Sequence, residues 1–154
     1  MAQYQEQYLK LSFILGLHSS NILQYRLELG ILQPIHKGAS GKAILVFLSD
    51  DKINEVLEQE GVPTSDAQQI WIDMEKIRSV DYSYTFSERK NESVGIGTPI
   101  FDATNKVVGS IISAIPLSLY KVETKQITID KILETAREIP YHLGRNETAE
   151  SKEQ

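Results

Sequence analysis

Residues 94–116 read VGIGTPIFDATNKVVGSIISAIP, and this stretch decides the fold. Apolar, mostly β-branched residues alternate along both halves, which is the pattern of two largely buried strands. The segment between them, residues 102–106, supplies turn chemistry because Asp and Asn tolerate a positive φ angle and bond their own backbone. Gly95 and Gly97 lie inside the first strand. Such glycines mark either a bulge in an ordinary hairpin or a place where a ligand or another chain comes close.

The rest of the chain favours a mixed α/β domain. Of its 154 residues, 41% are hydrophobic and 24% are charged, as in ordinary globular proteins. The hydrophobic periodicity predicts strands over residues 8–17, 22–29 and 82–86, and helices over residues 40–48, 50–60, 66–79 and 124–142.

The domain is expected to cover residues 8–144. We expect a ragged terminus over residues 1–7 and disorder over the charged tail, residues 145–154. No stretch reaches the roughly 18 unbroken apolar residues of a membrane span, and no apolar leader is visible. The sequence therefore predicts a cytoplasmic protein with no membrane contact.

Composition argues against several kinds of site. The chain has no cysteine, so disulfides and thiolate sites are excluded. His18, His36 and His142 are scattered and lack the spacing of a zinc site, and we predict no metal and no cofactor. The formal charge is −5 without a basic stripe, so the chain alone should not bind DNA. No nucleophile–base pair is visible; we predict that the protein is not an enzyme and has no catalytic residues.

Residues 34–45, PIHKGASGKAIL, form a glycine-bearing loop that runs into a helix. A phosphate-binding P-loop would need glycine where His36 stands and Ser or Thr where Ala43 stands, so that interpretation fails. Two alternatives stay open. The start of this helix offers unpaired backbone N–H groups and could bind an anion, or Gly41 merely permits close packing.

Four blocks in order resemble the IclR family of bacterial and archaeal transcriptional regulators, in their effector-binding domain. Residues 34–45 are similar to its P-x-H-x-x-A-x-G-K-A-x-L signature, and Glu88 stands where the family has an acidic residue. The strand pair and the last helix match further family blocks, at residues 98–102 (TPIFD), 107–113 (VVGSIIS), 136–139 (AREI) and 143–144 (LG). The resemblance covers roughly residues 20–144.

The resemblance implies a GAF/PAS-like α+β domain, a curved antiparallel β-sheet flanked by helices, with a small-molecule pocket at its hollow face. It also implies a homodimer or homotetramer. Family members read DNA through a separate helix-turn-helix domain, which we do not find in this sequence. The implied function is a ligand-sensing and oligomerising domain whose effector shifts the arrangement of attached DNA-binding domains.

Carried over by motif, the implied ligand-binding positions come from the helix start, the acidic loop and the final strands. They are Tyr25, Ala39, Ser40, Gly41, Thr85, Glu88, Gly95, Ile112 and Ala114. Members that bind small carboxylates carry a polar Ser-x-Ser pair where this chain has Ile112 and Ala114. We therefore expect a roomier, more apolar pocket and an apolar or aromatic effector. The alternative is a structural dimerisation domain whose pocket is vestigial and binds nothing.

Overall fold

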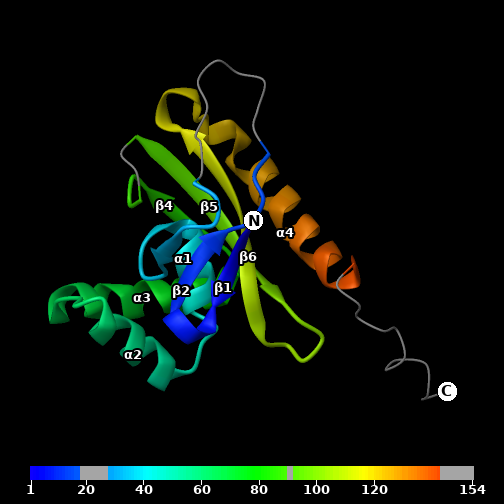
Figure 1. Ribbon diagram of the computed structural model, residues 1–154. Helices are drawn as coiled ribbons and strands as arrows, with labels where there is room; N and C mark the ends of the chain where they lie inside the picture. The colour runs from blue at the N-terminus through cyan, green and yellow to red at the C-terminus, as the bar shows by residue number, and fades with distance from the viewer. Residues whose placement is uncertain (18–27, 90–91, 143–154) are drawn as a thin grey trace.

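The computed structural model describes residues 1–17, 28–89 and 92–142, with the backbone alone at residues 140–142. Its strands are β1 (Ala2–Gln5), β2 (Lys10–Phe13), β3 (Leu32–Pro34), β4 (Ser83–Phe86), β5 (Ser93–Phe101) and β6 (Val107–Pro116). Its helices are α1 (Gly38–Leu45), α2 (Asp50–Gln59), α3 (Thr64–Val80) and α4 (Lys125–His142). The strands form one antiparallel sheet in the order β3-β2-β1-β6-β5-β4 (Figure 1). The predicted class, a curved antiparallel sheet flanked by helices, is confirmed.

The predicted hairpin is the long pair β5 and β6, which runs in register from Ser93 opposite Pro116 to a register shift between Ile100 and Phe101. The turn works as its residue types indicate. The Asp102 carboxylate accepts hydrogen bonds from the Thr104 and Lys106 N–H groups, at 2.8 and 3.1 Å.

The two faces of β5 pack against different helices. Val94 and Ile96 are buried in a cluster with Ile129 of α4 on one face. Gly95 and Gly97, in the alternate positions, face Ala39 of α1 on the other. Helices α1, α2 and α3 therefore lie on one side of the sheet, and helix α4 lies on the other (Figure 1). The larger core lies on the α1 side and takes its most buried residues from β2, α1, α2 and α3: Leu11, Phe13, Ile44, Leu45, Ile53, Val56 and Met74.

Gly95 and Gly97 let α1 pack directly on the strand. A Cβ atom at position 97 would lie 2.6 Å from the backbone oxygen of Ala39, and one at position 95 would lie 3.0 Å from the Ala39 Cβ. The segment that comes close to these two glycines is thus α1 of the same chain. This close approach fixes where the first turn of α1 stands.

The expected ragged terminus over residues 1–7 is wrong. β1 (Ala2–Gln5) lies between β2 and β6, with Ala2 opposite Phe13 on one side and Ser110 on the other. Its side chains alternate between buried Ala2 and Tyr4 and the more exposed Gln3 and Gln5, a period-2 signal that its terminal position obscured.

One other predicted strand is shorter in the structure, and another falls mostly on residues that the structure does not describe. The strand expected over residues 8–17 is shorter, because β2 ends at Phe13 and both Ile14 and Leu15 are exposed. The strand expected over residues 22–29 lies mostly outside the described residues, as does the tail from residue 145.

The helices agree more closely with their predictions. Helix α1 begins two residues before its predicted start and ends three residues before its predicted end. The bounds of α2 and α3 nearly match their predictions. Ser49 caps α2, since its hydroxyl accepts from the Lys52 N–H at 3.4 Å. Ile70, Met74 and Ile77 form the buried stripe of α3.

The packing of α1 on β5 predicts different costs for two alanine substitutions. Gly97→Ala should lower the free energy of unfolding by about 2–3 kcal/mol, because its methyl group would meet a backbone oxygen that cannot move aside. Gly95→Ala should cost less, since it meets the ends of two side chains. Urea unfolding measures both values.

A second substitution supplies the control. Ala39→Gly removes the methyl group next to position 95 and should partly restore the Gly95→Ala variant, but it leaves the Ala39 backbone oxygen in place. Equal recovery of the Gly95→Ala and Gly97→Ala variants by Ala39→Gly would contradict this account of the contact.

Candidate functional site

The start of α1 is held by contacts from several elements. Gly38 opens the helix with a φ angle of +73°, and its N–H donates to the Glu88 carboxylate at 3.1 Å. Farther along the first turn, the hydroxyl of Ser83 donates to the Ala39 carbonyl at 2.6 Å. The hydroxyl of Ser110 donates to the Ser40 carbonyl at 3.0 Å. Polar side chains of the sheet therefore fix α1 above β4, β5 and β6.

A small cavity lies between this turn and the sheet, with a volume of about 20 Å³. Its walls come from β2, α1, β4, β5, β6 and the β4–β5 loop: Phe13, Gly38, Ala39, Thr85, Glu88, Arg89, Ser93, Gly95, Ile112 and Ala114. A volume of this size holds about one water molecule. The expectation of a roomier pocket is therefore wrong for this cavity.

The structure brings together most of the predicted ligand-binding positions. Ala39, Thr85, Glu88, Gly95, Ile112 and Ala114 all line the small cavity.

The remaining predicted positions do not line it. Ser40 is fully buried and is not among the lining residues. Gly41 lies against the backbone of Ile35, where an added Cβ would stand 2.5 Å from the Ile35 oxygen. The packing alternative therefore accounts for Gly41. Tyr25 lies outside the described residues.

Arg89 is one reason why the cavity is small. Its guanidinium donates to Gln33 Oε1 at 2.6 Å, to the Pro34 carbonyl at 2.9 Å and to the Lys37 carbonyl at 2.7 Å. The same group stands 5.9 Å from the ring centre of Phe13. The sequence did not single out Arg89, and no local pattern could have shown that this side chain lines the cavity.

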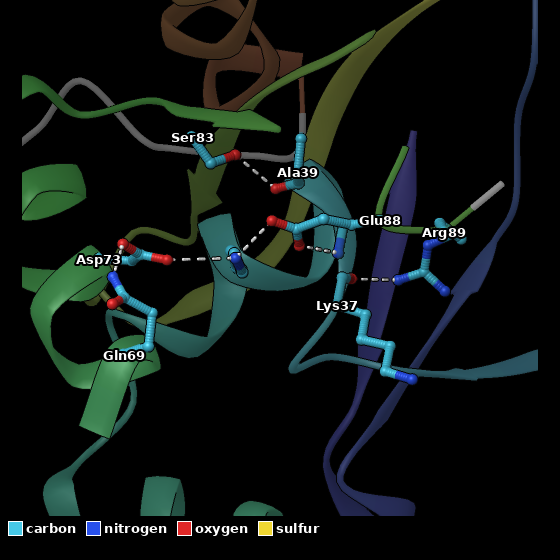
Figure 2. A network of polar contacts seen from close by, with 9 residues as sticks. Lys37, Ala39, Gln69, Asp73, Ser83, Glu88 and Arg89 are labelled. Carbon is cyan, nitrogen blue, oxygen red and sulfur yellow. Dashed lines mark hydrogen bonds and ion pairs between the residues drawn. The ribbon is translucent and has the colours of Figure 1, made fainter. Parts of the chain in front are cut away.

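A partly buried ion-pair network stands beside the cavity. Lys42 of α1 is 7% exposed, and its Nζ lies 2.7 Å from Glu88 Oε1 and 3.5 Å from Asp73 Oδ2. Gln69 donates to the other oxygen of Asp73 at 2.9 Å. Figure 2 shows Glu88 and Arg89 at the start of α1, with Asp73 and Gln69 approaching from α3. The sequence singled out Glu88 but not Lys42 or Asp73.

Two wider hollows flank this network. One, of about 510 Å³, lies between the loop before α1, the α2–α3 loop and helix α3, and Lys42, Asp73 and Glu88 are among its lining residues. The other, of about 270 Å³, lies between α3 and β4 and is lined by the same three residues among others.

His36 lines the larger hollow and is 9% exposed. Its Nδ1 atom has no hydrogen-bond partner in the part of the chain that the structure describes. Burial lowers the pKa of the His36 imidazole below its usual value; the Glu60 carboxylate opposes this effect, and the charge of Lys37 adds to it. The folded protein therefore favours the neutral form of His36 more than the unfolded chain does.

Two kinds of feature are absent from residues 1–17, 28–89 and 92–142. Within these ranges no group of three or more His, Asp or Glu residues could hold a metal ion. Within the same ranges no helix is long and apolar enough to cross a membrane.

Comparison with known proteins identifies related domains. The family model for the C-terminal part of the bacterial transcriptional regulator IclR matches residues 9–141. The chain is also similar to the C-terminal domain of a transcriptional regulator from Vibrio cholerae, with 27% sequence identity and a TM-score of 0.74 over 88% of this chain and 81% of that one. No curated protein sequence matches significantly.

Longer regulators share the fold. The IclR transcriptional regulator from Alicyclobacillus acidocaldarius has 16% identity and a TM-score of 0.82, over 93% of this chain and 59% of that one. The repressor BlcR from Agobacterium tumefaciens has 18% identity and a TM-score of 0.73, over 93% of this chain and 58% of that one. The chain spans 60% and 55% of the regulators that it matches from Rhodococcus and Silicibacter.

The lowered pKa of His36 predicts a loss of stability in acid. In the unfolded chain a histidine takes up its proton near pH 6.5, whereas folded His36 does so at a lower pH. The unfolded state therefore binds more protons as the pH falls below about 6.5, and the free energy of unfolding drops.

Urea unfolding at pH 7.5 and pH 5.5 measures this effect in the wild type and in His36→Gln. The variant should lose less stability between the two pH values, because glutamine does not titrate. Carboxylates and the other histidines contribute equally to both proteins and cancel. The same loss in both proteins would contradict a depressed His36 pKa.

Proposed function

Because the chain belongs to the family of IclR C-terminal domains, we propose that it senses a small-molecule effector at the start of α1 and oligomerises. The family is one of transcriptional regulators, and this domain type is its regulatory, effector-binding part. In the proposal, the effector prefers one of two arrangements of the paired domains. Binding then changes how attached DNA-binding domains stand relative to each other.

The observation that carries the proposal is the convergence of separate elements on one small cavity. Helix α1, strands β4, β5 and β6, and the β4–β5 loop all contribute walls, and six positions expected from the resemblance are among them. Ligand sites are concave, mostly apolar and supplied with few polar groups. Phe13, Ile112 and Ala114 provide the apolar surface here, and Thr85, Glu88 and Ser93 provide polar groups.

These walls support an effector with an apolar or aromatic body. Ile112 and Ala114 offer no side-chain hydrogen bond, so a ligand group buried against them without a partner would lose its hydration at a cost. A polar group on the effector would instead face the α1 end of the cavity. Glu88 lines that end, and the Lys42 ammonium lies 2.7 Å from its carboxylate.

One observation favours the alternative of a structural dimerisation domain with a vestigial pocket. The cavity of about 20 Å³ is far smaller than the 300–1,000 Å³ common for ligand pockets. For a sensing domain, side chains must therefore move aside before an effector enters. For a structural domain, no movement is needed and nothing binds.

Thermal unfolding with a metabolite panel separates the two functions. A ligand at about 100 times its dissociation constant should stabilise the sensing domain by about 2.7 kcal/mol and raise Tm by roughly 5–10 °C. The variant Ala114→Leu fills the cavity and should abolish this shift. Phe86→Ala, at an exposed position on the opposite face of the sheet, should retain it.

If no member of a broad panel moves Tm in the wild type, the structural alternative stands. Equal ligand shifts in Ala114→Leu and wild type would place the binding site elsewhere.

Oligomerisation gives a separate prediction, because paired domains are required for the proposed response. Light scattering on the purified chain should give a mass of two or four chains at micromolar concentration. A mass of one chain at these concentrations, with and without ligand, would remove the mechanism that depends on paired domains.

A further inference from the structure

Glu88 occupies the junction of three hollows. Its side chain lines the cavity of about 20 Å³, the hollow of about 510 Å³ and the hollow of about 270 Å³. Lys42 and Asp73 line only the two larger ones. The Glu88 carboxylate therefore stands where the small cavity meets the wider space beside α1.

The two donors that hold this carboxylate are well suited to an organic anion. Glu88 Oε2 accepts from the Gly38 N–H, at the positive end of α1, and Glu88 Oε1 lies 2.7 Å from Lys42 Nζ. The Lys42 side chain is only 9% exposed, so its ammonium depends on a nearby negative charge. Asp73, at 3.5 Å, is a more distant partner.

The carboxylate of Glu88 is the exposed member of this pair. The Glu88 side chain is 31% exposed, whereas Lys42 is fixed in the buried part of α1. A change of side-chain rotamer would carry the Glu88 carboxylate into solvent, where it is well hydrated. Lys42 would then keep only the more distant Asp73, so another anion in the position that Glu88 leaves would restore its shorter ion pair.

We propose that Glu88 is a built-in competitor of the effector, which occupies the anion position of the site in the free protein. The effector is then an organic carboxylate with an apolar body. Its carboxylate replaces that of Glu88 on the Gly38 N–H and the Lys42 ammonium, and its body enters the space that joins the small cavity to the wider hollows.

This inference rests on the proposed function and adds the chemistry of exchange. Substitution of one carboxylate for another keeps Lys42 paired, so the exchange involves no uncompensated buried charge. A neutral ligand would displace Glu88 and leave the ammonium with Asp73 alone. The site therefore selects anions, although its far walls are apolar.

Chemical rescue of Glu88→Ala tests the proposal with acetate and benzoate as probes. Thermal unfolding is measured at constant ionic strength, with chloride, acetamide and benzamide as matched controls. The variant should melt below the wild type, and acetate and benzoate should raise its Tm in a saturable way. In the wild type the apparent affinity for benzoate should be at least about tenfold weaker, because Glu88 fills the site for most of the time.

Three further variants support the test. Glu92→Ala removes another carboxylate from the same loop. The Glu92 carboxylate takes part in no described hydrogen bond or ion pair, so this variant should behave as the wild type. Adding Lys42→Met to Glu88→Ala should abolish rescue by removing the ammonium. Glu88→Gln keeps the shape of the side chain and replaces Glu88→Ala if that protein does not fold; carboxylates should bind it more tightly than the wild type.

The outcomes distinguish this inference from the proposed function. If an effector stabilises the wild type but carboxylates do not rescue Glu88→Ala or bind Glu88→Gln more tightly, self-occupancy by Glu88 is wrong and effector sensing stands. If carboxylates rescue the variant but nothing moves the wild type, Glu88 fills an anion site and effector sensing is wrong. Equal responses to benzoate and benzamide would overturn the selection for anions.

Discussion

The contact between Ala39 and the two glycines of β5 is the constraint on which the rest of the structure depends. It sets the distance between α1 and the sheet, because neither Gly95 nor Gly97 carries a side chain to separate them. At this distance Ser83 reaches the Ala39 carbonyl, so the polar residues of the sheet can also hold the helix. The first turn of α1 is thereby presented to the β4–β5 loop, and Lys42 stands within reach of Glu88.

Local patterns were sufficient to predict the parts of the fold that depend on neighbouring residues. The β5–β6 hairpin followed from alternation and from Asp102 in the turn, and α2 followed from its hydrophobic periodicity. Strand β1 could not be recognised in this way. Its four residues gain their place from partners on β2 and β6, which a short alternating segment near a terminus does not reveal.

The candidate site shows the same division. The resemblance placed Ala39, Gly95 and Ile112 around one space, and they do line one cavity. The size of that space was not predictable, because it depends on where the Arg89 side chain turns. Arg89 finds its acceptors on Gln33, on Pro34 and on Lys37, more than fifty residues earlier in the chain. Such a long-range choice leaves no period or motif in the sequence.

The position of β1 has a consequence for biosynthesis. Its neighbour β6 comes about one hundred residues later in the sequence, with Ala2 paired to Ser110. During translation the β1–β2 hairpin emerges before β6 and keeps an open edge until the ribosome has released β6. Pairings of this range slow folding, and an open edge invites association with other chains. The yield of correctly assembled protein should thus depend on how quickly β6 closes the sheet once it leaves the exit tunnel.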